Sequence, residues 1–136
     1  MSHPVRAARR RIQDEWRPLV EGVNDCANRV AEPWDTSRTT NPDRVVVPLR
    51  AALESAGLLE QLPLLLADAV EAADCELEAR PVPAPPYVTV TSRGPVLRTT
   101  IDPGRLVIRF DAFEVVRDPI PAYRRLDGVA LDISLE

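Results

Sequence analysis

The chain has 136 residues, is 45% hydrophobic but only 4% aromatic, and carries a formal net charge of -4 at pH 7. This length suits one compact domain with an aliphatic core. No stretch approaches the ~18 uninterrupted apolar residues of a membrane-spanning helix. Composition therefore excludes a membrane span and predicts a single globular domain over residues 1–136.

The basic residues counted as Lys+Arg number 17, and all of them are arginine. The N-terminal arginines are followed by no apolar segment of the kind that secretory signals contain. We therefore expect an intracellular, cytoplasmic protein. Cys26 and Cys75 have no metal-ligand spacing, and intracellular thiols usually stay reduced. We expect both to be free thiols, with a disulfide between them as the alternative.

The first predicted element is a long helix from Pro4 to the residues before Pro33. Its apolar residues recur at alternating spacings of four and three, which forms a heptad seam. So short a seam favours a helix packed on a sheet over a dimeric coiled coil, which stays the alternative. The seam consists of Ile12, Trp16, Leu19, Val23, Cys26 and Val30.

Two further helices are predicted after a polar connector at residues 34–42. The second begins at Pro42 or Pro48 and ends at Gly57, which has the character of a glycine C-cap. The third covers residues 58–74, with a break or kink at Pro63. Residues 1–80 are thus mainly helical, with about three helices.

The C-terminal part, residues 81–136, reads mainly as β-structure. Residues 87–116 contain three alternating apolar and polar runs separated by two turn signals, which predicts an antiparallel β-meander. Short strands at residues 75–79 and 129–136 would bring the sheet to four or five strands, with a bulge near Asp111 and a loop at residues 119–128. The fold class is therefore α+β, with the helices packed on the sheet.

The segment PPYVTVTSRGPVLRTTIDPGRLVIRFDAFEV lies within this meander. It resembles an uncharacterised family of small haloarchaeal proteins, and the resemblance covers the C-terminal two-thirds of the chain. The absence of lysine agrees with such a source. The resemblance implies a compartment and a structural class, and it implies no activity.

The turns also predict how the strands pair. Faces match when Thr99 lies opposite Ile108 and Leu97 lies opposite Phe110. This register makes Arg98 and Arg109 direct neighbours on the outer face of the sheet.

Like charges placed opposite each other are destabilising, so the pair Arg98 and Arg109 requires a negative charge. Asp132 on the last strand is the internal candidate, and a bound anion or a partner is the alternative. Tyr87 lies on the same outer face and makes it less polar.

A second basic cluster begins the first helix, where Arg9 and Arg10 oppose the helix dipole together with two neighbouring arginines. These residues could form a patch for phosphate or an acidic partner. The alternative is a solvated face neutralised by Asp14 and Glu15.

No catalytic or metal-binding constellation stands out, the only histidine is His3, and no cofactor is predicted. We therefore expect a non-enzymatic protein-interaction or scaffold module, whose partner is another protein or a second copy. The alternative is nucleic-acid or anion binding through the basic sheet face and the N-terminal arginines. Nucleic acid is the less favoured ligand, because the helix that would enter a groove is acidic. The candidate contact residues are Arg98, Arg109, Tyr87, Arg9 and Arg10.

Overall fold

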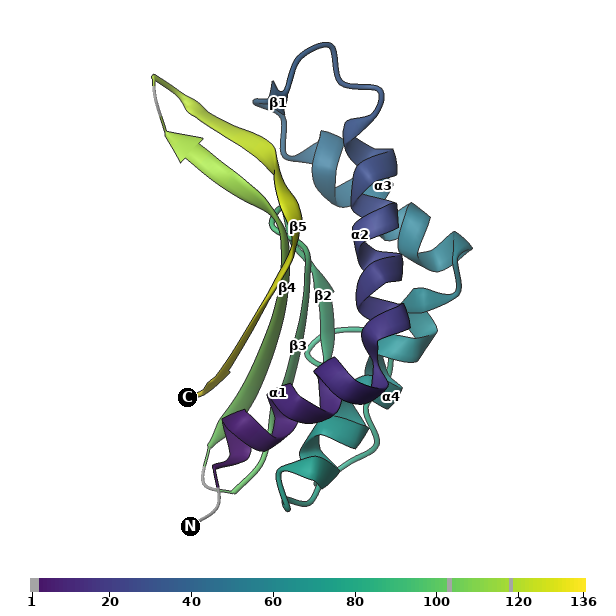
Figure 1. The fold of residues 1–136 in the computed structure, drawn as a ribbon, viewed down its shortest axis with the longest axis vertical. Helices are drawn as coiled ribbons and strands as arrows, with labels where there is room; N and C mark the ends of the chain where they lie inside the picture. Colours follow the sequence, from purple (N-terminus) through teal and green to yellow (C-terminus); the bar gives the residue numbers. More distant parts are fainter. Residues whose placement is uncertain (1–2, 103, 118) are drawn as a thin grey trace.

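A computed structural model describes residues 3–102, 104–117 and 119–136. Within these ranges, four helices cover one face of a five-stranded antiparallel sheet of order β1-β5-β4-β3-β2 (Figure 1). The α+β class is confirmed, with four helices rather than three. The elements are α1 (Pro4–Glu15), α2 (Arg17–Ala31), β1 (Arg38–Thr39), α3 (Asp43–Ser55), α4 (Leu58–Ala72), β2 (Val88–Val90), β3 (Pro95–Thr100), β4 (Arg105–Arg117) and β5 (Pro121–Leu135).

The predicted long first helix is wrong, because the chain breaks into α1 and α2 at Trp16, whose φ of -118° and ψ of 18° are not helical. The cause is Pro18, which has no N–H to donate and whose ring would clash with the carbonyl of Asp14 in a continuous helix. Near the start of a new helix the same proline fits well. The break lets α1 and α2 pack in different directions (Figure 1).

Two prolines further along the helical part of the chain lie inside helices without ending them. Pro48 lies within α3 and Pro63 within α4. The two helices are joined at Gly57, whose positive φ of 74° is the left-handed conformation that glycine adopts without strain. The predicted bounds of the third helix agree with α4 to within two residues at its C-terminal end.

The β-meander is confirmed, but its register differs from the prediction by two residues. Leu97 pairs with Ile108, and Thr99 pairs with Leu106. Turns shorter than expected cause the shift. In the first turn, for example, Thr91 and Gly94 exchange two backbone hydrogen bonds of 3.0 and 3.1 Å. A shift of two residues keeps every side chain on its predicted face but changes its neighbours across the strands.

The C-terminal hairpin is longer than predicted. The expected loop at residues 119–128 is wrong from Pro121 onward, because β5 begins there and pairs with β4. The bulge is confirmed between Asp111 and Phe113. No strand forms at residues 75–79, whereas the predicted connector contains β1, which pairs with β5.

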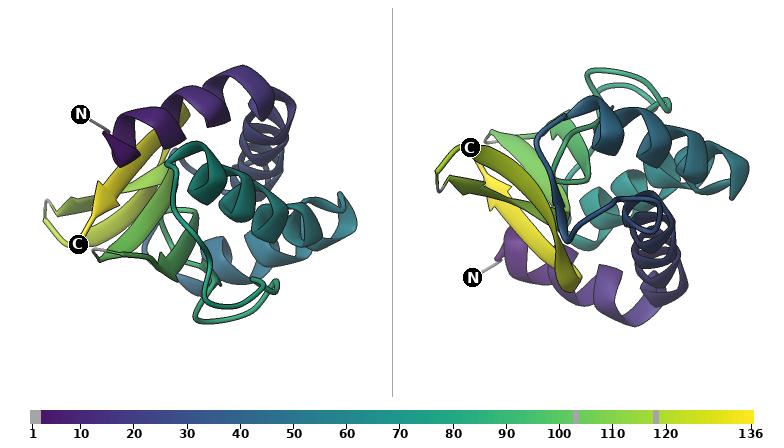
Figure 2. Two further views of the ribbon diagram at one scale, coloured as in Figure 1. Left: turned by 90° about the horizontal axis from the view of Figure 1, so that it is seen from below. Right: turned by 90° about the horizontal axis from the view of Figure 1, so that it is seen from above.

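The core lies between the inner face of the sheet and the helices. Leu97, Ile108, Phe110 and Phe113 are fully buried there. Of the six seam residues on the first two helices, all except the half-buried Trp16 belong to this core. The sheet bends so that its concave side faces away from the helices, which all lie on the other side (Figures 1 and 2).

Candidate functional site

The candidate site is the outer face of the sheet, the side that turns away from the helices. Among the described residues no helix or strand covers this face (Figure 2). Strand alternation places charged and apolar residues of β3, β4 and the C-terminal end of the chain on it, seven of which matter for the site. They are Val96, Arg98, Arg105, Val107, Arg109, Asp132 and Glu136.

Two valines on this open face are nevertheless buried: Val107 has 0% of its surface exposed and Val96 has 8%. Val107 pairs with Arg98, and Arg105 and Arg109 lie two residues away on its own strand and face. Arginine stems commonly cover apolar surface while the charged group stays in water. We infer that the arginine stems cover Val107, since no other layer does.

Arg109 is neutralised within the chain. Its Nη1 lies 3.3 Å from Oδ2 of Asp132, and its Nη2 lies 3.3 Å from Oε2 of Glu136. The pairing of Arg109 with Asp132 is therefore confirmed. The predicted direct pairing of Arg109 with Arg98 is wrong, because the shifted register places Val96 opposite Arg109.

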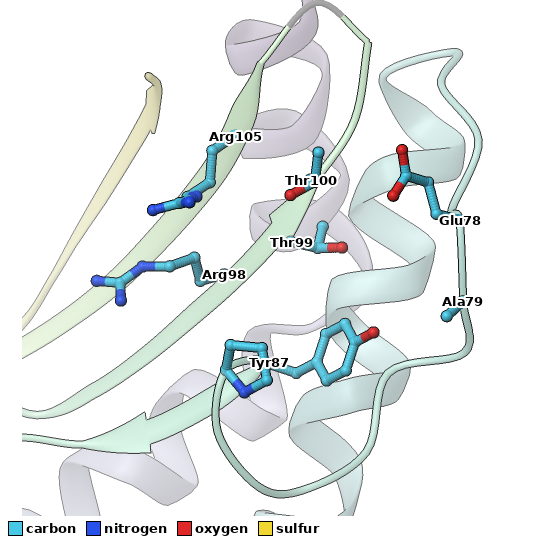
Figure 3. A pocket seen from close by; sticks show the side chains of 8 residues that line it. Glu78, Ala79, Tyr87, Arg98, Thr99, Thr100 and Arg105 are labelled. Carbon is cyan, nitrogen blue, oxygen red and sulfur yellow. The ribbon is translucent and has the colours of Figure 1, made fainter.

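Arg98 and Arg105 differ from Arg109, because no salt bridge or side-chain hydrogen bond involves either one within the described ranges. Arg105 pairs with Thr100, which lies two residues after Arg98 on the same strand and face. Their side chains project in the same direction from adjacent strands (Figure 3). The outer face thus presents two neighbouring positive charges that no carboxylate of the described chain neutralises.

A pocket of about 240 Å³ lies beside these arginines. It borders the last residues of β3, which extend beyond the part of β3 that pairs with β2. Its lining includes both arginines, Thr100, Tyr87 and Glu78. The ring of Tyr87 extends toward the segment of residues 78–79, away from the arginine side chains (Figure 3). The predicted contact residues Tyr87 and Arg98 therefore line one pocket.

The N-terminal arginines belong to a different part of the molecule. Arg9 lies on α1 and donates a hydrogen bond of 2.8 Å to the carbonyl of Leu131 in β5, and Arg10 is exposed on the same helix. Arg11 pairs at 2.7 Å with Asp68 of α4 rather than with Asp14 or Glu15. The helices and the outer face lie on opposite sides of the sheet, so the structure does not join these arginines with Arg98.

Arg105 is the residue that sequence analysis missed. The predicted register, with Thr99 opposite Ile108, leaves Arg105 in the second turn. In the structure Ile101 donates a 2.7 Å hydrogen bond to the carbonyl of Gly104, and β4 begins at Arg105, so Arg105 lies in the strand. A two-residue turn between the two strands, combined with the same alternation of inner and outer residues, would have placed Arg105 on the outer face.

Arg125 lies on the inner side of the sheet, beside the bulge. Its guanidinium donates to the carbonyls of Ala112, Leu126 and Gly128 at 2.7 to 2.9 Å, and to Asn24 of α2. Burial lowers the pKa of Arg125, and the charge of Asp127 partly offsets this. These contacts hold the bulge against α2, so Arg125 has a structural role.

Other kinds of site find no support in the described ranges. They contain no group of three metal-ligating side chains and no helix long and apolar enough to cross a membrane. Cys26 and Cys75 are both free, as predicted. Burial raises the pKa of the Cys26 thiol, so burial disfavours its reactive thiolate.

The fold and the site together define a small α+β domain with a helical layer on one side of its sheet and an open, arginine-bearing face on the other. The chain matches the family described as "Domain of unknown function (DUF7988)" over residues 6–136, and it belongs to that family. Comparisons with curated proteins and with solved structures gave no match.

Proposed function

We propose that the protein is a non-enzymatic protein-interaction module that binds an acidic segment of a partner protein on its outer face. The observation that carries the proposal is the pair Arg98 and Arg105 on an uncovered, concave face. Arg98 is half-buried and Arg105 is exposed, and neither has a carboxylate partner among the described residues. Unneutralised charge of one sign favours a partner of the opposite sign and steers its approach.

The shape of the face favours a different protein over a second copy. Two concave faces placed against each other would leave a gap at their centre, whereas interfaces between proteins pack as closely as protein interiors. Val96 and Val107 add apolar surface beneath the arginine stems, and a partner that displaced the stems would contact it.

The alternative proposal, nucleic-acid binding, has less support. It needs a continuous basic stripe, whereas Arg9 and Arg10 lie in the helical layer and Arg109 is already paired with two carboxylates. The lysine-free composition supports one further proposal, a haloarchaeal source.

The test is the binding of a fluorescent poly-glutamate peptide, measured by anisotropy over a series of salt concentrations. We expect the wild-type protein to bind it and the double variant Arg98→Gln/Arg105→Gln to lose most of that binding. The matched control is Arg29→Gln/Arg50→Gln, which removes the same charge from exposed helix positions.

Equal binding by both double variants would show that only net charge matters, and it would overturn the proposal. Light scattering at the same salt concentrations distinguishes the partner classes. If the wild-type protein were a dimer and the Arg98→Gln/Arg105→Gln variant a monomer, the outer face would bind a second copy.

A further inference from the structure

The pocket beside Arg98 lies at an open edge of the sheet. The three residues of β2 pair with β3, and Val88 at the start of β2 lies opposite Leu97. One further hydrogen bond of 2.9 Å runs from the N–H of Arg98 to the carbonyl of Tyr87. Before Tyr87 the chain turns away, because the N–H groups of Tyr87 and Val88 both bond to the carbonyl of Ala84. The rest of β3 has no strand beside it on this edge within the described residues.

The backbone of Thr100 faces that edge. In an antiparallel strand, residues two apart direct their N–H and C=O groups to the same side. Arg98 directs its N–H toward β2, so Thr100 directs its own N–H and C=O to the same side, where β2 has ended. The pocket of about 240 Å³ occupies this place and is lined by Thr100.

The donors around the pocket are suited to an oxyanion. Arg98 and Arg105 both line the pocket, and their guanidinium groups extend on its outer-face side, away from Glu78 and Tyr87 (Figure 3). Thr100 supplies a hydroxyl and an edge-facing N–H. The single acid in the lining is Glu78, which leaves an excess of positive charge and forms no salt bridge with either arginine within the described ranges.

We infer that this pocket binds a phosphate monoester. A carboxylate has two oxygens and one charge, which one guanidinium can satisfy, whereas a phosphate has three acceptor oxygens and a charge of about -1.5 to -2 near neutral pH. Two arginines that project side by side from adjacent strands match the larger anion. The pocket is smaller than the ~300–1,000 Å³ of most small-molecule sites, so it accepts one phosphorylated group rather than a large ligand.

This inference rests on the proposed function, since the phosphate would be carried by the acidic partner. A phosphate on a free metabolite would present the same chemistry to the pocket. Two probes separate the sources: phenyl phosphate, a free monoester, and a glutamate-rich peptide with one phosphoserine, which models the partner. The peptide with serine in place of phosphoserine is the reference.

Calorimetric titrations of these probes test the inference. We expect the phosphopeptide to bind at least about tenfold more tightly than its serine form. The Arg98→Gln/Arg105→Gln variant should remove this difference, and the Arg29→Gln/Arg50→Gln control should keep it. If phenyl phosphate binds as tightly as the phosphopeptide, the site serves a free phosphate monoester and the partner source is wrong.

The edge donor has its own pair of variants. Thr100→Val removes the hydroxyl but keeps the N–H, and Thr100→Pro removes both without breaking the ladder to β4, because proline is tolerated where the N–H faces an open edge. We expect Thr100→Pro to weaken phosphopeptide binding by about threefold or more beyond Thr100→Val. Thermal unfolding should show that both variants are folded.

The two proposals fail in different ways. Equal affinity for the phosphopeptide and the serine peptide, with both lost in the Arg98→Gln/Arg105→Gln variant, would overturn the phosphate site and leave the acidic-partner proposal standing. No binding of either peptide would overturn both. Phosphate selectivity that survives in the Arg98→Gln/Arg105→Gln variant would place the site elsewhere and overturn this inference.

Discussion

The two faces of the sheet differ in how they bury apolar side chains and how they satisfy arginines. On the inner face Ile108 packs into a rigid core of helix and strand residues, while its neighbour Val107 is equally buried, at 0% exposure, beneath the outer-face arginines. On the inner side Arg125 is held by carbonyl groups, whereas Arg98 on the outer side has no partner among the described residues.

Burial alone does not make a side chain part of a packed core. Val107 is shielded by long side chains that can move, and a flexible cover can be exchanged for a partner. The inner face has no such freedom, because well-packed interiors relax little.

Ile108→Ala and Val107→Ala should differ in stability although the two residues are equally buried. The inner substitution leaves a cavity in a packed core and should lower the free energy of unfolding by about 2–5 kcal/mol. Val107→Ala removes two methyl groups beneath arginine side chains that can move into the vacated space. We therefore expect it to lower the free energy of unfolding by about 1–2 kcal/mol. Urea denaturation measures both, and equal losses would mean that the outer face is as rigidly packed as the core.

Arg125→Ala should cost about 3 kcal/mol of unfolding free energy, since several half-buried carbonyls at the bulge lose their donor at once. The neighbouring Arg124 provides the control. It pairs with Glu114 at the surface, with 2.8 Å between its Nε and the Oε1 atom. Arg124→Ala should cost no more than about 1 kcal/mol, because surface ion pairs contribute little.

A similar loss in the two variants would contradict a structural role for Arg125. If Arg125→Ala lost helical structure together with β-structure, that result would further support the structural role, since this arginine joins the bulge to Asn24 of α2.

Sequence patterns predicted much of the fold because they depend on local chemistry. Alternation in β3 and β4 placed Arg98 and Arg109 on the outer face correctly, and the change of parity after Phe110 predicted the bulge. The single first helix was wrong because its heptad seam was followed through Pro18, where the backbone rule against interior proline should have taken precedence.

The candidate site was harder to predict, because a site depends on neighbours and not only on faces. A two-residue change in register kept Arg98 on its face but replaced Arg109 with Val107 as its cross-strand partner and brought Arg105 beside it. Turn length decides this, and the turn between β3 and β4 closes at Gly104, where an added Cβ would clash with the carbonyl oxygen of Glu136. That close approach is a tertiary fact that no local pattern contains.

Arg109→Gln should have a small effect that depends on salt. Its two carboxylate partners are more than half exposed, so the pairs should contribute no more than about 1 kcal/mol and less as ionic strength rises. Urea denaturation at low and high salt measures this. The same substitution should leave acidic-peptide binding nearly unchanged, because Arg109 is already neutralised. A loss as large as that of the Arg98→Gln/Arg105→Gln variant would contradict the distinction between the paired and unpaired arginines.

The smallest expected effect concerns Asp111, the acid at the end of the outer face next to the bulge. Burial raises the pKa of its carboxyl group, opposed by Arg93 and Arg109 and reinforced by Asp132. The folded protein therefore holds this proton more tightly than the unfolded chain does. Between the ordinary pKa of 3.8 and the raised value in the folded state, stability falls as pH rises.

Asp111→Asn removes this ionisation. We expect the variant to be more stable than the wild type at pH 7 by about a few tenths of a kcal/mol, since the group is partly exposed and solvent screens its charge. At a pH below 3.8, where the carboxyl group is protonated in both states, the advantage should disappear. Urea denaturation across this range measures the difference. A variant less stable than the wild type at pH 7 would mean that the ionised Asp111 stabilises the arginine-rich face, and the outer side would then neutralise more of its own charge than the salt bridges of Arg109 indicate.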